Sequence, residues 1–257
     1  MILFVSITSA FSSAYAIELS PAATMKIGRQ IWQNECGGTV AGLTSWNTGE
    51  NFASLGIGHF IWYPKSVRGP FEESFPDFAR FAAEHKAHLP EIITANLASG
   101  CPWSSRTEFL AASNEPRMLE LRHFLAETVP LQAEFLVQRL RAALPKMLAA
   151  APAAERGSLQ EKFDGVASTA QGCYALVDYV NFKGEGVLDT ERYRGQGWGL
   201  LQVLEGMKKT ATGPAAAEEF AHSARAVLTL RVKNSPPERK ETRWLPGWLQ
   251  RVTTYAH

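Results

Sequence analysis

A single glutamate at a helix end is the residue of this sequence best suited to acid catalysis. Glu35 precedes Cys36-Gly37-Gly38, and a glycine-rich, strand-like run, Ser54-Leu55-Gly56-Ile57-Gly58-His59, follows shortly after. A carboxylic acid held partly away from water keeps its proton near neutral pH and can donate it to the leaving oxygen of a glycosidic bond. This layout therefore favours carbohydrate cleavage with Glu35 as the general acid. Taken alone, a helix-end glutamate is more often a solvated surface residue.

Cleavage of a carbohydrate also requires side chains that hold the sugar. Sugar rings offer apolar C–H faces to aromatic residues and hydroxyl groups to amides. Residues of these types lie near the strand-like run and in a later glycine-rich loop: Trp46, Phe60, Trp62, Tyr63, Gln196 and Trp198. Each aromatic residue could equally pack in a core, and we prefer this interpretation for Phe60.

The segment that positions Glu35 is predicted to be a helix over residues 21–34. Ser20 suits the N-cap, Pro21 suits the first helical position, and Gly37-Gly38 favours a left-handed C-cap. Glu35 then lies in the last helical turn or just beyond it. Residues 43–63 carry turn and strand signals and predict two or three short antiparallel strands.

The sequence after Phe75 is predicted to be largely helical. Ser104-Ser105-x-x-Glu108 matches a capping box, and Pro130 and Pro145 are expected to break the apolar segment 119–151. Further helices are expected over 170–182, 199–209, 215–232 and 239–255. The expected fold class is α+β, predominantly helical, with a small antiparallel β-hairpin region beside a helical lobe.

Composition and the amino-terminal segment limit the class of protein. The chain has 257 residues and a formal net charge of +1, which gives no electrostatic reason to expect nucleic acid as a partner. Residues 1–16 are apolar and end in Ala14-Tyr15-Ala16, which resembles a signal peptide cleaved before Ile17, although no basic residue precedes the apolar core. We expect a periplasmic or secreted protein without a membrane-spanning segment in the mature chain. Residues 17–257 are expected to form one domain, with a helix plus β-hairpin lobe over 17–70 and a helical lobe over 71–257.

The cysteines and histidines show no metal-binding motif. Cys36, Cys101 and Cys173 lack metal-type spacing, and an exported protein is compatible either with a Cys101–Cys173 disulfide or with three buried thiols. The sequence also lacks a phosphate-binding or dinucleotide fingerprint. We therefore expect a monomer that uses neither a cofactor nor a metal.

The order of these features resembles the phage-type lysozymes and endolysins of the lysozyme-like superfamily. In that family the acid precedes a hairpin that ends in a Gly-Ile-Gly-His strand, as Glu35 precedes Gly56-Ile57-Gly58-His59. The segment 175–184, which ends in Asn181-Phe182-Lys183-Gly184, is similar to the family's helix that lines the cleft. The segment 234–239, followed by residues 244–255, resembles the family's Asn-x-x-Pro-x-Arg turn and its closing helices. The three motifs come in the family's order and span most of the mature chain.

The resemblance implies a lysozyme-like fold and the cleavage of peptidoglycan or a related β-1,4-linked amino-sugar glycan. Glu35 takes the position of the general acid, and Ser54 that of a hydroxyl residue that helps to hold the attacking water. His59 takes the position of the motif histidine, which we expect to be structural, behind the strand. Arg239 falls where the family has an arginine near the acid. The resemblance also implies that Asn181 and Phe182 line the cleft.

The second carboxylate of the family's inverting hydrolases is missing from its usual place. Thr48, which cannot act as a base but is expected to contact the substrate, stands there, and Glu50 lies two residues on. If Glu50 faces Glu35 across about 6.5–9.5 Å, a water fits between them and inverting hydrolysis is possible. If Glu50 points away, Glu35 acts alone, as in the lytic transglycosylases of this superfamily.

Two further alternatives are a glycan-binding relative without activity and an unrelated helical protein in which the motifs coincide by chance. Of all these, we prefer an enzyme that uses the Glu35–Glu50 pair.

Overall fold

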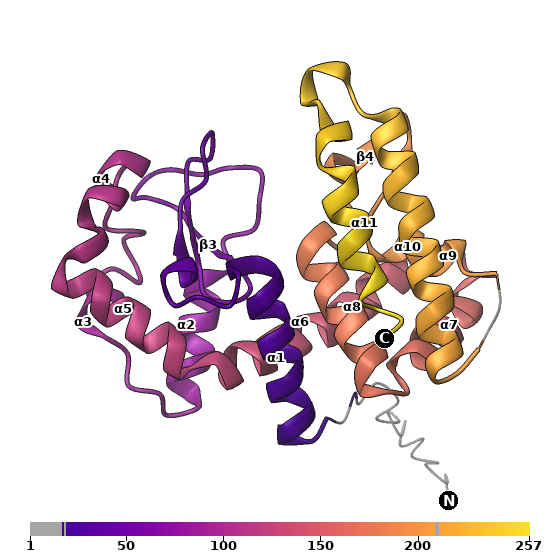
Figure 1. Cartoon of the computed structure of the whole chain (residues 1–257), viewed down its shortest axis with the longest axis horizontal. Helices are drawn as coiled ribbons and strands as arrows, with labels where there is room; N and C mark the ends of the chain where they lie inside the picture. Colours follow the sequence, from indigo (N-terminus) through magenta and orange to yellow (C-terminus); the bar gives the residue numbers. More distant parts are fainter. Residues whose placement is uncertain (1–16, 18, 209–210) are drawn as a thin grey trace, which may run out of the picture.

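The structure, a computed structural model, describes residues 17, 19–208 and 211–257. It is mostly helical with a small antiparallel sheet, which confirms the predicted fold class. Figure 1 shows two lobes joined by the long helix α6 (Val129–Ala150). None of the helices in the described ranges combines the length and the apolar character needed to cross a membrane.

The first lobe combines a three-stranded sheet with short helices. The sheet has the antiparallel order β1-β2-β3. The elements of this lobe are α1 (Pro21–Cys36), η1 (Ala41–Leu43), β1 (Thr44–Ser45), β2 (Ala53–Leu55), β3 (Phe60–Trp62), α2 (Phe75–Glu84), α3 (Glu91–Thr94), α4 (Arg106–Ala111), η2 (Ala112–Asn114) and α5 (Pro116–Glu127).

The second lobe is helical apart from one two-stranded ribbon. Its elements are α7 (Arg156–Ala167), α8 (Ala170–Lys183), η3 (Asp189–Glu191), β4 (Arg192–Tyr193), β5 (Gln196–Gly197), α9 (Leu200–Gly206), α10 (Pro214–Asn234), η4 (Pro237–Arg239), η5 (Glu241–Arg243) and α11 (Leu245–Thr253). The helices predicted over 170–182 and 215–232 are confirmed. The segment predicted as one helix over 239–255 consists instead of 3-10 turns followed by α11.

Helices α2 and α5 lie beyond the predicted lobe boundary near residue 70 and pack with the sheet lobe and with α6: α2 contacts β3 and α6, and α5 contacts η1, η2 and α6. The aromatic face of α2 is buried against β3: the Phe60 and Phe78 rings stack with centroids 5.0 Å apart, and Trp62 lies 4.7 Å from Phe75. The apolar face of an amphipathic helix goes where a complementary apolar surface exists. The lobes therefore divide at α6.

Helix α1 has the ends that the sequence predicts. The Ser20 hydroxyl accepts a hydrogen bond from the amide of Ala23 at 3.2 Å, and Gly37 ends the helix in the left-handed conformation with φ 60°. Glu35 thus lies in the last turn. Helix α1 packs on both α6 and α8, so its carboxyl end is held between the lobes.

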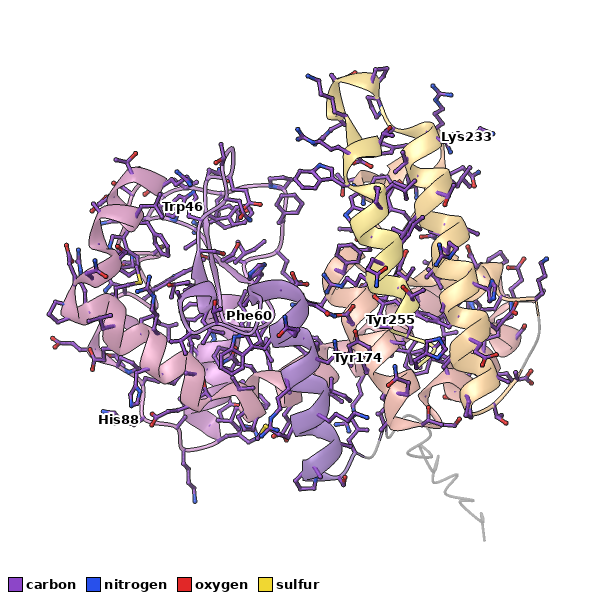
Figure 2. The ribbon with its side chains drawn as sticks, in the orientation of Figure 1. Trp46, Phe60, His88, Tyr174, Lys233 and Tyr255 are labelled. Carbon is purple, nitrogen blue, oxygen red and sulfur yellow. The ribbon has the colours of Figure 1, made fainter. Side chains whose placement is uncertain are left out.

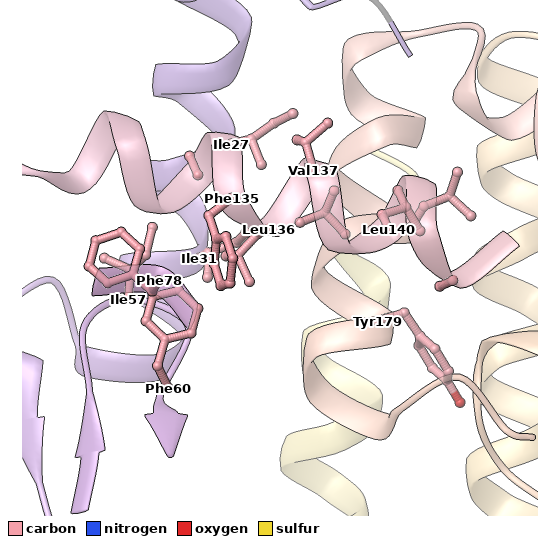
Figure 3. Close-up of a cluster of buried hydrophobic side chains, with 14 of the residues drawn as sticks. Ile27, Ile31, Ile57, Phe60, Phe78, Phe135, Leu136, Val137, Leu140 and Tyr179 are labelled. Carbon is pink, nitrogen blue, oxygen red and sulfur yellow. The ribbon is translucent and has the colours of Figure 1, made fainter. Parts of the chain in front are cut away.

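Helix α6 carries one apolar core from the sheet to the second lobe (Figure 3). The Phe135 ring lies 5.4 Å from both Phe60 and Phe81, and Leu140 is buried further along the helix. Pro130 occupies the first turn, where a missing N–H costs little, and separates α5 from α6 as predicted. Pro145, however, lies inside α6 without ending it. Burial of the neighbouring Leu144 and Met147 provides the packing that keeps the helix intact.

The three cysteines are free thiols buried in separate places, so the Cys101–Cys173 disulfide is wrong and the alternative of three buried thiols is confirmed. The predicted signal peptide, 1–16, lies outside the described residues.

Candidate active site

Side chains from three distant segments meet at the Glu35 carboxylate. Arg251 of α11 donates from Nη2 to Oε1 at 2.6 Å, and Asn181 of α8 donates from Nδ2 to the same oxygen at 3.4 Å. Nδ1 of His59 lies 3.5 Å from the other oxygen, Oε2. The Glu35 side chain is 14% exposed, so it is sheltered from water but remains reachable. The carboxylate is therefore held in a fixed orientation by residues from distant segments.

The turn between β2 and β3 explains the Gly-Ile-Gly-His motif. Gly56 has φ +71°, and a Cβ there would lie 2.3 Å from Oε1 of Gln132. That oxygen accepts the Ile57 amide at 2.7 Å, and Ile57 is buried below the turn. His59 itself has φ 47°, which is uncommon for a residue other than glycine. The turn therefore presents the His59 ring to Glu35, and the predicted structural place behind the strand is wrong.

The His59 ring also touches the thiol next to Glu35. Its Nε2 lies 3.7 Å from Sγ of Cys36, so a thiol, an imidazole and a carboxylate stand in line. That order occurs in cysteine hydrolases, where the thiolate is the nucleophile. Here burial, reinforced by the charge of Glu35, raises the pKa of Cys36 to about 12. Its thiol donates to the Gly56 carbonyl at 3.5 Å, so Cys36 is a packing residue and not a nucleophile.

A buried carboxylate holds Arg251 in place. Asp178 is 0% exposed and accepts from Nε and Nη2 of Arg251 at 2.7 and 2.8 Å, from the Tyr255 hydroxyl at 2.6 Å and from Asn34 at 3.1 Å. Burial alone would lower the pKa of Arg251, but Asp178 and Glu35 together hold that pKa well above its usual value. A permanently charged, rigid guanidinium therefore orients the acid.

The prediction that Arg239 is the arginine near the acid is wrong. Arg239 is exposed in η4, where its charge acts on Tyr193, whereas Arg251 reaches Glu35. The sequence does contain a signal for this network: Asp178 interrupts the apolar run of α8, and a carboxylate in such a run needs a buried cation. Tyr174 and Tyr255, which flank the network, lie in the second lobe beside α1 (Figure 2).

A cleft of about 670 Å³ runs between the lobes, and among the described residues Glu35 does not line it but contacts two residues that do, His59 and Asn181. Its walls include His59 and Ile61 from the first lobe and Asn181 and Phe182 from the second. The Arg251 guanidinium lies 4.1 Å over the Phe182 ring, which fixes that aromatic face at the cleft wall. Asn181 and Phe182 thus lie where the resemblance places them.

Glu50 and Ser54, the other predicted catalytic residues, lie on the sheet side. Ser54 is buried and pairs directly with Ile61, so both side chains share the sheet face that borders the cleft. Glu50 accepts from Nδ2 of Asn47 at 3.1 Å. Burial raises the pKa of Glu50, while the hydrogen bonds from Asn47 and the charge of His59 oppose the rise. Glu50 and Glu35 thus both interact with His59, and their pairing stays a prediction.

Two of the predicted sugar-binding tryptophans are core residues. Trp62 is fully buried, because side chains alternate along β3 and its place points inward with Phe60 while Ile61 faces the cleft. Trp46 is buried against Phe109, with ring centroids 5.7 Å apart. Phe60 packs in the core, as predicted. Trp46 and Trp62 also pack in the core, so the prediction that they bind sugar is wrong.

The remaining predicted contacts differ in their access to the cleft. Trp198 lines it, although the Arg231 guanidinium covers its ring at 4.1 Å. Gln196 is exposed in β5, and Thr48 is exposed at the tip of the hairpin between β1 and β2. Neither of the two is among the residues that form the cleft walls in the described part of the chain.

The burial of Lys183 is not evident from the sequence. This residue ends α8, lines the cleft and is only 9% exposed, with Nζ 3.3 Å from the ring centroid of Trp248 and 3.8 Å from that of Phe182. The pKa of Lys183 is lowered to about 6, chiefly by burial. The charges of Arg231 and Arg251 also lower this pKa, whereas those of Glu241 and Glu35 raise it. The amine is therefore largely neutral at pH 7.

Lys183→Met is expected to stabilise the fold in a pH-dependent way. Because the folded-state pKa of about 6 lies below the ordinary value of 10.5, the unfolded chain binds one more proton between these pH values, and the Lys183 contribution to stability rises with pH across that window. The variant should gain roughly 2–4 kcal/mol near pH 6.5 and progressively less towards pH 10. Urea unfolding at several pH values measures this gain. Lys146→Met, at an exposed lysine, should show no such trend, and a gain independent of pH would contradict the expectation.

Among the described residues, no group of three or more His, Cys, Asp or Glu side chains is arranged to hold a metal ion. The arrangement around Glu35 is the basis for a functional interpretation, since no family model, curated protein or solved structure matches this chain.

Proposed function

We propose that this protein is a lysozyme-like enzyme that cleaves a β-1,4-linked amino-sugar glycan of the peptidoglycan type, with Glu35 as the general acid. One observation carries the proposal: His59 and Asn181, from two of the sequence motifs, meet at the Glu35 carboxylate with Arg251, from the helix that follows the third. Motifs that match a family by chance have no reason to converge on one acid. The cleft between the lobes provides space for a glycan beside it.

The contacts of Glu35 suit the charge that develops during proton donation. As the proton leaves for the glycosidic oxygen, the carboxyl group becomes negative. The N–H groups of Arg251 and Asn181 already point at Oε1 and stabilise that charge without rearrangement. Oε2 faces His59 and is the oxygen without a strong donor, so it is the better position for the acidic proton.

Glu50 is the proposed general base that activates water for inverting hydrolysis. A base works best when its pKa is raised towards the working pH, and burial raises the pKa of Glu50. Its interaction with His59, which also contacts Glu35, supports a place near the acid. Ser54, on the cleft face of the sheet, is the hydroxyl group assigned to the attacking water.

Glu50→Gln tests this pairing. We expect a loss of about 10²–10⁴-fold in cleavage of purified sacculi, because water activation is removed while the Asn47 contact can be kept by the amide oxygen. Thr48→Ala, two residues away at the exposed hairpin tip, is the control and should leave the rate unchanged. Mass analysis of the products should find reducing ends. Unchanged activity in Glu50→Gln together with anhydromuramic ends would instead identify a lytic transglycosylase with Glu35 acting alone.

A further inference from the structure

The cleft wall contains four long basic side chains, and three of them have carboxylate partners. Arg139 pairs with Glu72 at 3.2 Å, Lys146 with Glu185 at 2.9 Å, and Arg231 with Glu241 at 2.8 Å. Within the described residues, Lys183 forms neither an ion pair nor a hydrogen bond through its side chain. It is also the most deeply buried of the four. A buried amine without a partner is costly, so its presence at a cleft calls for a ligand.

The carboxylates that act on Lys183 are already occupied. Glu241 is held by two hydrogen bonds from Arg231, and Glu35 is held by Arg251. The other neighbours of the amine are the ring faces of Phe182 and Trp248, which attract a cation, and the guanidinium groups of Arg231 and Arg251, which oppose one. An anion that enters the cleft would therefore find a free donor flanked by positive charge.

This arrangement discriminates among amino-sugar polymers. A polymer with free amino groups brings positive charge to Arg231 and Lys183 and is disfavoured. A neutral acetylated polymer offers the buried amine only uncharged oxygen acceptors, which form weaker hydrogen bonds than a carboxylate does. A polymer whose sugars carry carboxylates provides the missing acceptor in a site sheltered from water, where a charge-assisted hydrogen bond is strong.

We propose that Lys183 is the specificity residue of this cleft and binds a carboxylate carried by the glycan, so that the substrate is an acidic amino-sugar polymer and neither chitin nor chitosan. The inference rests on the proposed function, because it assigns a substrate feature to the same cleft. Binding is coupled to protonation: the amine has a pKa of about 6 when the cleft is empty and takes up a proton as the carboxylate arrives.

The test is isothermal titration calorimetry of the full chain at pH 7.5 with two matched disaccharides. N-acetylglucosaminyl-N-acetylmuramic acid carries a lactyl carboxylate, and N,N′-diacetylchitobiose (chitobiose for short) is the same disaccharide without the lactyl ether. The acidic sugar should bind at least about tenfold more tightly, the range expected for one hydrogen bond to a charged group. Titration in two buffers of different ionisation heat should show uptake of nearly one proton with the acidic sugar and none with chitobiose.

A third probe identifies the source of the carboxylate. Coupling L-alanine to the lactyl group masks that carboxylate and places another further out. Preference for the uncoupled acid would assign the site to the lactyl group, and preference for the conjugate would assign it to the attached peptide.

Two variants distinguish the effect of Lys183 on binding from the effect of the other basic residues in the cleft. Lys183→Met should abolish both the preference and the proton uptake, while Lys146→Met, which removes a paired lysine of the same cleft, should keep both. If Lys183→Met folds poorly, the titrations of the unmutated protein alone test the inference. Equal affinity for the two disaccharides without proton uptake would overturn it. If the protein cleaves sacculi but shows no preference for the acidic sugar, the role of Lys183 is overturned and the proposed function stands. If it prefers the acidic sugar but cleaves nothing, the proposed function is overturned and the role of Lys183 in binding stands.

Discussion

Glu35→Gln is expected to abolish cleavage of purified sacculi, with kcat lowered by about 10³-fold or more. The amide has almost the same shape as the acid but cannot donate a proton to the glycosidic oxygen. Arg251 and Asn181 can still donate to the amide oxygen, so the fold and the cleft should persist. Glycan binding is therefore expected to remain within a small factor of the unmutated protein.

Release of reducing ends, followed over time and resolved by mass, measures this prediction. Glu185→Gln is the matched control, because Glu185 is a glutamate of the cleft wall whose partner, Lys146, is half exposed and whose ion pair contributes little. Normal turnover by Glu35→Gln would remove Glu35 from the reaction. An unmutated protein that binds glycan without turning it over would identify a binding relative that lacks activity.

Asp178→Asn is expected to destabilise the protein by about 3–5 kcal/mol, the usual cost of removing one partner of a buried ion pair. Asp178 is the anion that compensates Arg251 inside the protein, and it also accepts the Tyr255 hydroxyl. An asparagine turns amide hydrogens towards these donors and leaves the guanidinium charge poorly compensated. Freed from Asp178, Arg251 no longer holds Glu35 in one orientation, so activity should fall in parallel.

Urea unfolding midpoints measure the loss of stability. Asp189→Asn, at a fully exposed aspartate 3.9 Å from Arg192, is the control and should change stability by less than about 0.5 kcal/mol. The double variant Asp178→Leu, Arg251→Met should recover much of the loss, because replacing a buried ion pair by apolar groups is often close to neutral. If Asp178→Asn lowers the free energy of unfolding by less than about 1 kcal/mol, another group must compensate the charge of Arg251.

The local elements that carry the site could be read from the sequence, because short-range stereochemistry specifies them. The Ser20 cap, the Pro21 start and the Gly37 end of α1 all depend on neighbouring residues, and they place Glu35 in the last turn. The short antiparallel strands and the glycine-rich turn before His59 follow from residue type in the same way. These signals were sufficient to choose the candidate acid.

The partners of that acid depend on how distant helices pack, which no local pattern contains. Arg239 and Arg251 are both basic residues near the carboxyl end, and only the side-chain contacts of α11 with α8 bring Arg251 and Asp178 together at Glu35. The same holds for Lys183, whose burial results from the meeting of α8 with Trp248 of α11. The sequence by itself thus determined the candidate acid, the turn that faces it and the fold class. The tertiary structure decided which cations surround the acid and which amine the cleft leaves without a counter-ion, because charges far apart in the chain become neighbours only when the apolar faces of their helices are buried together.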